Sequence, residues 1–161
     1  MSRDRNSLLI AGLIIIMSLG APNMTIANDT TLSIVNPPML GDPTPNGYST
    51  AVIVPAGGRV AYISGQGGFD STGGLSEDFA TQVKQAYANL GVAIDALGAT
   101  PDKVAKLTVY VVDHDMSKLG VLTQEVTAMF GADLPAQTLV PVPKLAVDPM
   151  LFEVEAVVLL D

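Results

Sequence analysis

Apolar residues recur every three or four positions between residues 79 and 97, and polar residues occupy most of the positions between them. This spacing is typical of an amphipathic helix. The apolar stripe consists of Phe79, Val83, Ala86, Leu90, Ile94 and Leu97. Ser76 is a suitable N-cap and Gly98 a suitable stop, so the pattern predicts one long helix between them.

A second helix is predicted from about Met116 to Phe130. Asp113 or Asp115 can cap its first turn, and Gly131 ends it. Two helices of this kind can cover one face of a single sheet.

Runs rich in β-branched and aromatic residues predict five strands. They cover residues 48–54, 59–64, 105–112, 138–140 and 152–160. The first two flank the turn sequence 55–58, so we expect them to pair as an antiparallel hairpin. The glycine-rich residues 65–74 are expected to form a loop whose backbone can approach a ligand closely. Flexibility alone explains these glycines equally well.

The predicted order of two strands, a helix, a strand, a helix and two strands indicates an α+β fold with a single mixed sheet. In the last strand the even positions are apolar throughout, whereas the odd positions change from Glu153 and Glu155 to Val157 and Leu159. The C-terminal end of this strand is therefore apolar on both faces. We expect helices to cover one face of the sheet and a neighbouring subunit to cover the other.

The first residues have the features of a secretory signal peptide. Arg3 and Arg5 precede an apolar run, residues 8–19, that is shorter than the roughly 20 residues a membrane-spanning helix needs. Small residues before position 28 fit a cleavage site, so residues 1–27 are expected to be a signal peptide. Cleavage after Ala21 and an uncleaved anchor are the alternatives. The expected location is periplasmic or secreted, with membrane contact only through the signal segment before cleavage.

The proline-rich residues 28–47 predict an extended lead-in, followed by a folded domain over residues 48–161. Without the signal peptide the chain has six basic and 15 acidic residues, a net charge of −9. This charge disfavours nucleic-acid binding, which needs cations to neutralise phosphates. The chain has no cysteine and a single histidine, His114, which excludes thiolate sites and multi-histidine metal centres. No metal or cofactor is expected.

Four short motifs lie in or beside the predicted strands. They are Tyr48-Ser49, Ile63-Ser64-Gly65-Gln66, Leu134-Pro135-Ala136-Gln137-Thr138 and Phe152-Glu153-Val154-Glu155-Ala156. Their order and spacing, together with the helix pattern, resemble the Rid (YjgF-like) family of reactive-intermediate deaminases over residues 48–161. The resemblance implies a chorismate-mutase-like fold, a homotrimer whose sheets form a central barrel, and three small-molecule clefts between subunits.

The resemblance also implies roles for individual residues. Glu153 matches the family glutamate that positions the attacking water, although it could equally be an outward-facing strand residue. Tyr48, Ser64 and Gly65 match cleft-lining positions, and Thr123 matches a polar position on a helix. Without the resemblance, Tyr48 is an ordinary strand aromatic, Gly65 a turn residue and Thr123 a solvent-facing one.

Gln137 stands where typical family members have an arginine that clamps the carboxylate of the substrate. An amide donates hydrogen bonds but carries no charge, so carboxylate binding is expected to weaken by about one to two orders of magnitude. Arg59 matches a position outside the family cleft. Lys144 is nearer to Gln137 in the sequence, and the sequence leaves open whether it replaces the arginine.

Two other combinations of residues carry less weight. Asp113, His114 and Asp115 are adjacent at a predicted turn, where side chains point in different directions, so they do not form a metal site by spacing. The sequence around Ser64 lacks the G-x-S-x-G turn of a serine hydrolase, so Ser64 and His114 are not expected to form a catalytic pair.

Two functions of different classes follow. The first is a Rid-type hydrolase or deaminase acting on an imine, an enamine or a related small metabolite, with Gln137 counting against the usual 2-imino acids. The second is a non-catalytic, trimeric small-ligand-binding protein of the cell envelope that uses the same cleft. Ribonuclease activity, which has been attached to some relatives, is disfavoured by the acidic charge.

Overall fold

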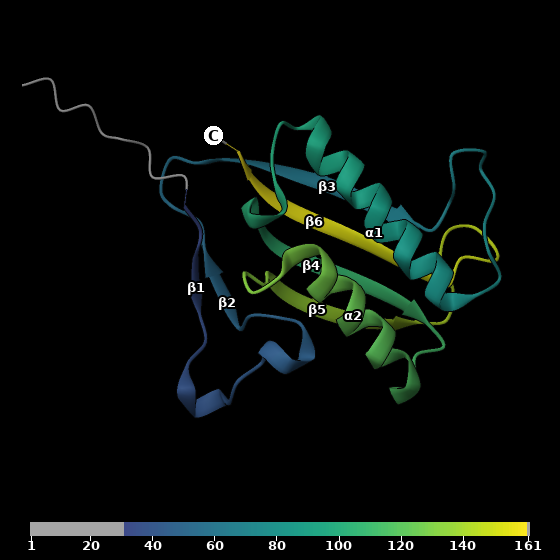
Figure 1. Ribbon diagram of the computed structural model, residues 1–161, viewed down its shortest axis with the longest axis horizontal. Helices are drawn as coiled ribbons and strands as arrows, with labels where there is room; N and C mark the ends of the chain where they lie inside the picture. Colours follow the sequence, from purple (N-terminus) through teal and green to yellow (C-terminus); the bar gives the residue numbers. More distant parts are fainter. Residues whose placement is uncertain (1–30, 161) are drawn as a thin grey trace, which may run out of the picture.

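Alternating apolar residues build a four-stranded sheet that two helices cover on one face, and a separate two-stranded ribbon lies at one end of it (Figure 1). The computed structural model describes residues 31–160. The elements are β1 (Ser33–Val35), η1 (Pro38–Leu40), η2 (Thr44–Asn46), β2 (Ala51–Ile53), β3 (Arg59–Gly67), α1 (Phe79–Ala96), η3 (Pro101–Lys103), β4 (Val104–Val112), η4 (Met116–Lys118), α2 (Leu119–Phe130), β5 (Ala136–Val142) and β6 (Phe152–Leu160).

The main sheet has the strand order β3-β6-β4-β5, in which only β4 and β5 are parallel. The even positions of β6, Phe152 to Val158, are buried in the core beneath α1 and α2. The odd positions Glu153, Glu155 and Val157 lie on the opposite face and are half-buried. The predicted α+β fold, with a mixed sheet and two helices on one face, is confirmed.

The first helix begins two residues later than the Ser76 cap predicts. Asp78 is the N-cap, and its carboxylate accepts hydrogen bonds from the Thr81 amide at 2.8 Å and from the Thr81 hydroxyl at 2.6 Å. Asp78 is the cap because its carboxylate reaches the amide of the third residue of the helix, whereas the Ser76 hydroxyl accepts from the amide of Asp78 itself. The buried stripe of α1 packs on β6, where Tyr87 stacks on Phe152 with ring centroids 5.9 Å apart.

The second helix also begins later than predicted. Residues 116–118 form a 3-10 turn, and α2 follows from Leu119 to Phe130. Asp115 caps that turn by accepting from the Ser117 amide at 2.7 Å. Gly131, with a φ of +60°, ends α2 as predicted.

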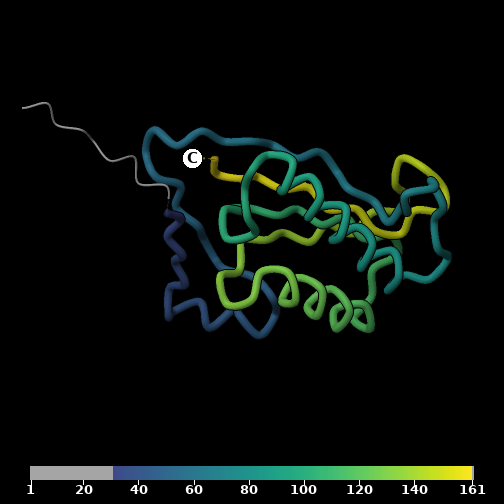
Figure 2. The backbone as a smooth tube through the Cα atoms, turned by 45° about the horizontal axis from the view of Figure 1, so that its top comes forward, coloured from purple at the N-terminus to yellow at the C-terminus, as the bar shows by residue number. Residues whose placement is uncertain are grey.

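The predicted hairpin between residues 48–54 and 59–64 is wrong. The turn itself forms, since the Gly58 amide donates to the Pro55 carbonyl at 3.3 Å. However, β2 pairs with β1 from the expected extended lead-in, with Ser33 opposite Ile53, and β3 pairs with β6. Figure 2 shows the chain leaving the ribbon and turning back before it enters β3. The lead-in therefore contains a strand and two 3-10 turns.

The predicted glycine loop is also partly wrong, because Gly65 and Gly67 belong to β3. A register shift between Ile63 and Gln66 places a β-bulge there. The bulge accommodates the extra residues and keeps the strand paired with β6 up to Gly67.

Amides on α1 hold the ends of β3 and β6 in place. Gln82 is fully buried, and its Nε2 donates to the carbonyls of Ser76 at 2.6 Å and Pro149 at 3.0 Å. Its Oε1 accepts from the Leu151 amide at 2.8 Å. Asn89 Nδ2 donates to the carbonyls of Gly67 at 2.8 Å and Phe69 at 2.9 Å.

Within residues 31–160, α1 and α2 are too short or too polar to cross a bilayer, and so is every shorter helical turn. The expected signal peptide, residues 1–27, lies outside the described residues.

Candidate functional site

Glu153 and Gly65, which the sequence assigns to one cleft, are in contact. Glu153 lies on β6 opposite Gly67 of β3 and Tyr110 of β4. A Cβ at Gly65 would lie only 1.6 Å from Glu153 Oε1. The carboxylate therefore occupies the space beside the bulge that a side chain would fill, and glycine is required there. Ser64 is exposed next to this contact, and its carbonyl accepts from Gln66 Nε2 at 3.0 Å.

Tyr110 is a neighbour of this carboxylate that the sequence analysis missed. Its hydroxyl donates to Glu155 Oε1 at 3.3 Å, and its Cα pairs with that of Glu153. Desolvation, the charge and hydrogen bond of Glu155, and the charge of Glu153 raise the pKa of the Tyr110 phenol. The alternation of Lys106, Thr108 and Tyr110 with apolar residues in β4 is the signal that could have found it.

Tyr48 and Thr123 belong to a second group, which gathers beside the start of β5. A Cβ at Gly47 would lie 2.5 Å from Val126 Cγ1 and 3.5 Å from Thr123 Cγ2, so the chain before Tyr48 runs directly over α2. The next residue, Ser49, forms a parallel bridge with Ala136. These contacts place Tyr48 between α2 and the outer edge of the sheet.

Gln137 is the third member of this group. It pairs with Leu107 of β4 and shares the helix-covered face of the sheet with Leu139, which packs against the core. Its Oε1 is buried and has no hydrogen-bond partner. Ser49 Oγ, next to it in the register, is also buried without a partner. The Tyr48-Ser49 motif could have pointed to this serine, which the sequence analysis did not assign.

One protomer does not bring the two groups together. Glu153 is on β6 and Gln137 on β5, with β4 between them, so the two strands lie about 10 Å apart. The two side chains also project from opposite faces of the sheet. Gly65, Ser64 and Glu153 thus form one candidate half-site, and Tyr48, Thr123 and Gln137 form another.

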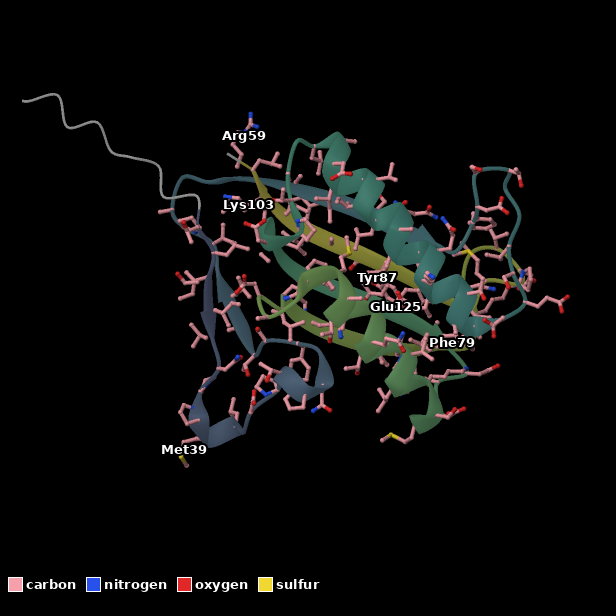
Figure 3. All side chains as sticks on the ribbon, in the orientation of Figure 1. Met39, Arg59, Phe79, Tyr87, Lys103 and Glu125 are labelled. Carbon is pink, nitrogen blue, oxygen red and sulfur yellow. The ribbon has the colours of Figure 1, made fainter. Side chains whose placement is uncertain are left out.

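Of three cations considered as replacements for an arginine at position 137, Lys144 and Lys106 are bonded to other residues and Arg59 lies at the far end of β6. Lys144 Nζ forms an exposed ion pair with Asp148 at 2.7 Å, in the loop beyond the far end of β5. Lys106 Nζ donates to Thr138 Oγ1, and burial lowers the pKa of this lysine. Arg59 pairs with Leu160 at the opposite end of β6 from Glu153, and its side chain projects outward (Figure 3).

His114 and its two aspartates do not gather into a metal site. The His114 Nδ1 atom is buried without a partner, while Asp115 is used as a helix cap. The part of the chain that the structure describes contains no group of three or more residues of the kind that ligate metals.

Comparison with known proteins identifies the family. The profile described as Endoribonuclease L-PSP matches residues 41–160. A RutC family protein from Pyrococcus abyssi is 33% identical over 119 residues, which are 71% of this chain and 88% of that protein. The chain belongs to the Rid (YjgF-like) family.

Rid proteins of known structure and a protein named as a deaminase are among its relatives. The Rid protein YyfB from Yersinia pestis, 33% identical, superposes with a TM-score of 0.77 over 81% of this chain and 99% of its own. RidA from an Antarctic Psychrobacter, also 33% identical, gives a TM-score of 0.59 over 70% of this chain and 88% of its own. The 2-iminobutanoate/2-iminopropanoate deaminase of Rattus norvegicus is 35% identical over 92 residues, which are 56% of this chain and 64% of the rat protein. These relatives support a deaminase-like role of the Rid type.

Proposed function

We propose that this Rid protein hydrolyses the C=N bond of a small imine, or of the imine formed from an enamine, with Glu153 as the residue that holds the attacking water. The observation that carries this proposal is the placement of the Glu153 carboxylate beside the side-chain-free backbone of Gly65. A carboxylate held in this way on the half-buried face of the sheet can accept a proton from a water whose oxygen attacks a small planar group nearby.

The reaction conserves all atoms without a cofactor. Water adds to the imine carbon and one of its protons passes through Glu153 to the nitrogen, which gives a carbinolamine. The hydroxyl proton of the carbinolamine then passes to the nitrogen in the same way, and the C–N bond breaks to release ammonia. The carbon is left as a carbonyl. Ser64 and Gly65 line the half-site where the carbon becomes tetrahedral.

The second half-site comes from another copy of the chain in a homotrimer. Two observations support this assembly: the Glu153 and Gln137 groups are separated within one protomer, and the sheet face opposite the helices carries half-buried apolar residues such as Val140 and Val157. Light scattering on the purified protein should give three times the protomer mass. A monomer would leave the two halves apart and contradict the shared cleft.

Gln137 sets this protein apart from deaminases of 2-imino acids. A charged hydrogen bond contributes roughly 1.5–3 kcal/mol, against about 1 kcal/mol for a neutral one. Ammonia release from freshly generated 2-iminobutanoate should therefore be slow for the unaltered protein and faster for Gln137→Arg. Glu153→Gln should abolish release from any substrate. Rapid turnover of 2-iminobutanoate by the unaltered protein would contradict the role given to Gln137.

The second candidate is a trimeric binding protein of the cell envelope that uses the same cleft without turnover. The loss of a charged group at position 137 favours it. A pure binder would be stabilised thermally by its ligand, would release no ammonia, and would respond little to Glu153→Gln. Ribonuclease activity fits less well, because the chain has a net charge of −8.

Export through the signal peptide, residues 1–27, is part of the proposal. The apolar run at 8–19, preceded by Arg3 and Arg5, supports it. Mass spectrometry of the mature protein from a periplasmic or secreted fraction should give a new N-terminus near Asn28. An intact Met1 in the cell interior would contradict it.

A further inference from the structure

The half-site around Gln137 contains polar atoms that lack partners. Gln137 Oε1 is buried and accepts no hydrogen bond. The hydroxyl of Ser49, a residue that is only 2% exposed, is also buried and has no hydrogen-bond partner. Both residues are held by the backbone: the Ser49 amide donates to the Pro135 carbonyl at 2.9 Å, and Gln137 pairs with Leu107. Buried acceptors without a donor are unfavourable, so a ligand that brings N–H groups to them gains stability.

The residues assigned to this half-site, Tyr48, Ser49, Thr123 and Gln137, carry no charged side chain. No lysine or arginine among the described residues donates to Gln137 Oε1. Lys106 is the cation nearest in the sheet register, opposite Ala136, but it binds Thr138, which projects from the other face of the sheet. The polar side chains of the assigned residues are therefore one amide and three hydroxyls, which offer both donors and acceptors without charge.

From this geometry we infer that the substrate carries a primary carboxamide in place of the usual carboxylate, and that the Gln137 amide recognises it. The inference rests on the proposed function for its assignment to a substrate. Gln137 Nε2 donates to the carboxamide oxygen, and a turn of the side chain lets Oε1 accept from the carboxamide N–H. A carboxylate has only acceptors, so it would face Oε1 unfavourably and lose its hydration without a counter-charge.

The substrate class is then a 2-imino carboxamide or its enamine tautomer. Water adds to the imine carbon, the C–N bond at that carbon breaks, and ammonia leaves. The product is a 2-oxo carboxamide, whose amide C–N bond stays intact. No oxidant or reductant is needed.

Pyruvamide and pyruvate provide the test, because they differ only in the amide and the carboxylate. Isothermal titration of the protein purified from the whole chain should show pyruvamide binding about tenfold more tightly than pyruvate. Equal affinities, tighter binding of pyruvate, or no binding of pyruvamide would each overturn the inference.

Three variants test whether Gln137 determines the preference for pyruvamide over pyruvate. Gln137→Arg should reverse it in favour of pyruvate, and Gln137→Glu, which keeps the side-chain size, should lose pyruvamide binding without gaining pyruvate. Gln124→Arg is the matched control, because it adds the same charge at an exposed position of α2. It should keep the preference for pyruvamide; a reversal there would mean that overall charge, and not Gln137, decides.

Measurements of ligand binding and of ammonia release together show whether this inference or the proposed reaction fails. If pyruvamide is preferred but no imine releases ammonia, the ligand class stands and the hydrolase proposal fails. If 2-iminopropanoate is hydrolysed as fast as its carboxamide, the hydrolase stands and the ligand class fails.

Discussion

The Glu153 carboxylate lies where the side chain of residue 65 would begin, so Gly65 and Glu153 share one space across two strands. A Cβ at position 65 would be 1.6 Å from Oε1 and 2.4 Å from the carboxyl carbon. The two residues are 88 positions apart in the sequence, and the β-bulge between Ile63 and Gln66 brings them together.

Gly65→Ala is expected to displace the Glu153 carboxylate and to lower the rate of imine hydrolysis about 100-fold, because a misplacement of about 1 Å has that effect on a reacting group. The rate of ammonia release checks this. Gly120→Ala is the matched control, since a Cβ at that position in α2 meets nothing within 4 Å. Equal rates for both variants would mean that the position of Glu153 does not matter.

Gln82→Leu should lower the free energy of unfolding by about 3 kcal/mol, because it leaves the Ser76 and Pro149 carbonyls and the Leu151 amide without their partner in a buried place. Urea denaturation measures the change. Gln124→Leu, on the exposed side of α2, should change the free energy by less than about 0.5 kcal/mol. A similar small effect at Gln82 would show that water replaces its bonds.

Asp78→Asn should make the protein less sensitive to acid. The side-chain and backbone hydrogen bonds from Thr81 lower the pKa of Asp78 below its ordinary value of 3.8. Because the folded pKa is the lower one, its contribution is complete above the ordinary value and is lost as the pH falls through the folded pKa. Asparagine keeps the capping acceptor and does not titrate.

The urea midpoint should therefore fall less in Asp78→Asn than in the unaltered protein between about pH 5 and pH 3. The other carboxylates with a lowered pKa, such as Asp70 and Asp115, contribute to both proteins and cancel in the comparison. Equal falls would exclude a titrating cap.

Glu155→Gln should lower the pKa of Tyr110 toward its ordinary value. The variant removes the negative charge that helps to hold the phenol in its neutral form. Alkaline titration of the ultraviolet absorbance gives the pKa, and Tyr110→Phe identifies which step belongs to this residue. An unchanged midpoint would mean that desolvation and the charge of Glu153 raise this pKa without Glu155.

Elements with a regular period were predicted well from the sequence. The alternation in β6 gave its bounds, Phe152–Leu160, without error. The apolar stripe of α1 was predicted correctly, but its N-cap was not. Ser76 and Asp78 are both residue types that cap helices, and only the structure shows that Asp78 is the one that accepts from the Thr81 amide.

Strand partners could not be read from local signals. The Pro55–Gly58 turn forms, yet its flanking strands pair with β1 and β6, and β1 has only three residues, too few for a period to be visible. Contact between Glu153 and Gly65 depends on a bulge that looks like a glycine loop in the sequence. That Ser49 Oγ and Gln137 Oε1 lack hydrogen-bond partners follows from their burial, which the sequence pattern does not predict.

The position of β6 in the sheet has a consequence for biosynthesis. It is the last described strand in the chain, yet it is the one that joins β3 to β4. A nascent chain that lacks β6 can form both helices and the parallel pair of β4 and β5, but no strand links β3 to them. The cell therefore holds an unfinished sheet until β6 has been synthesised, and its exposed strand edges need protection during that time.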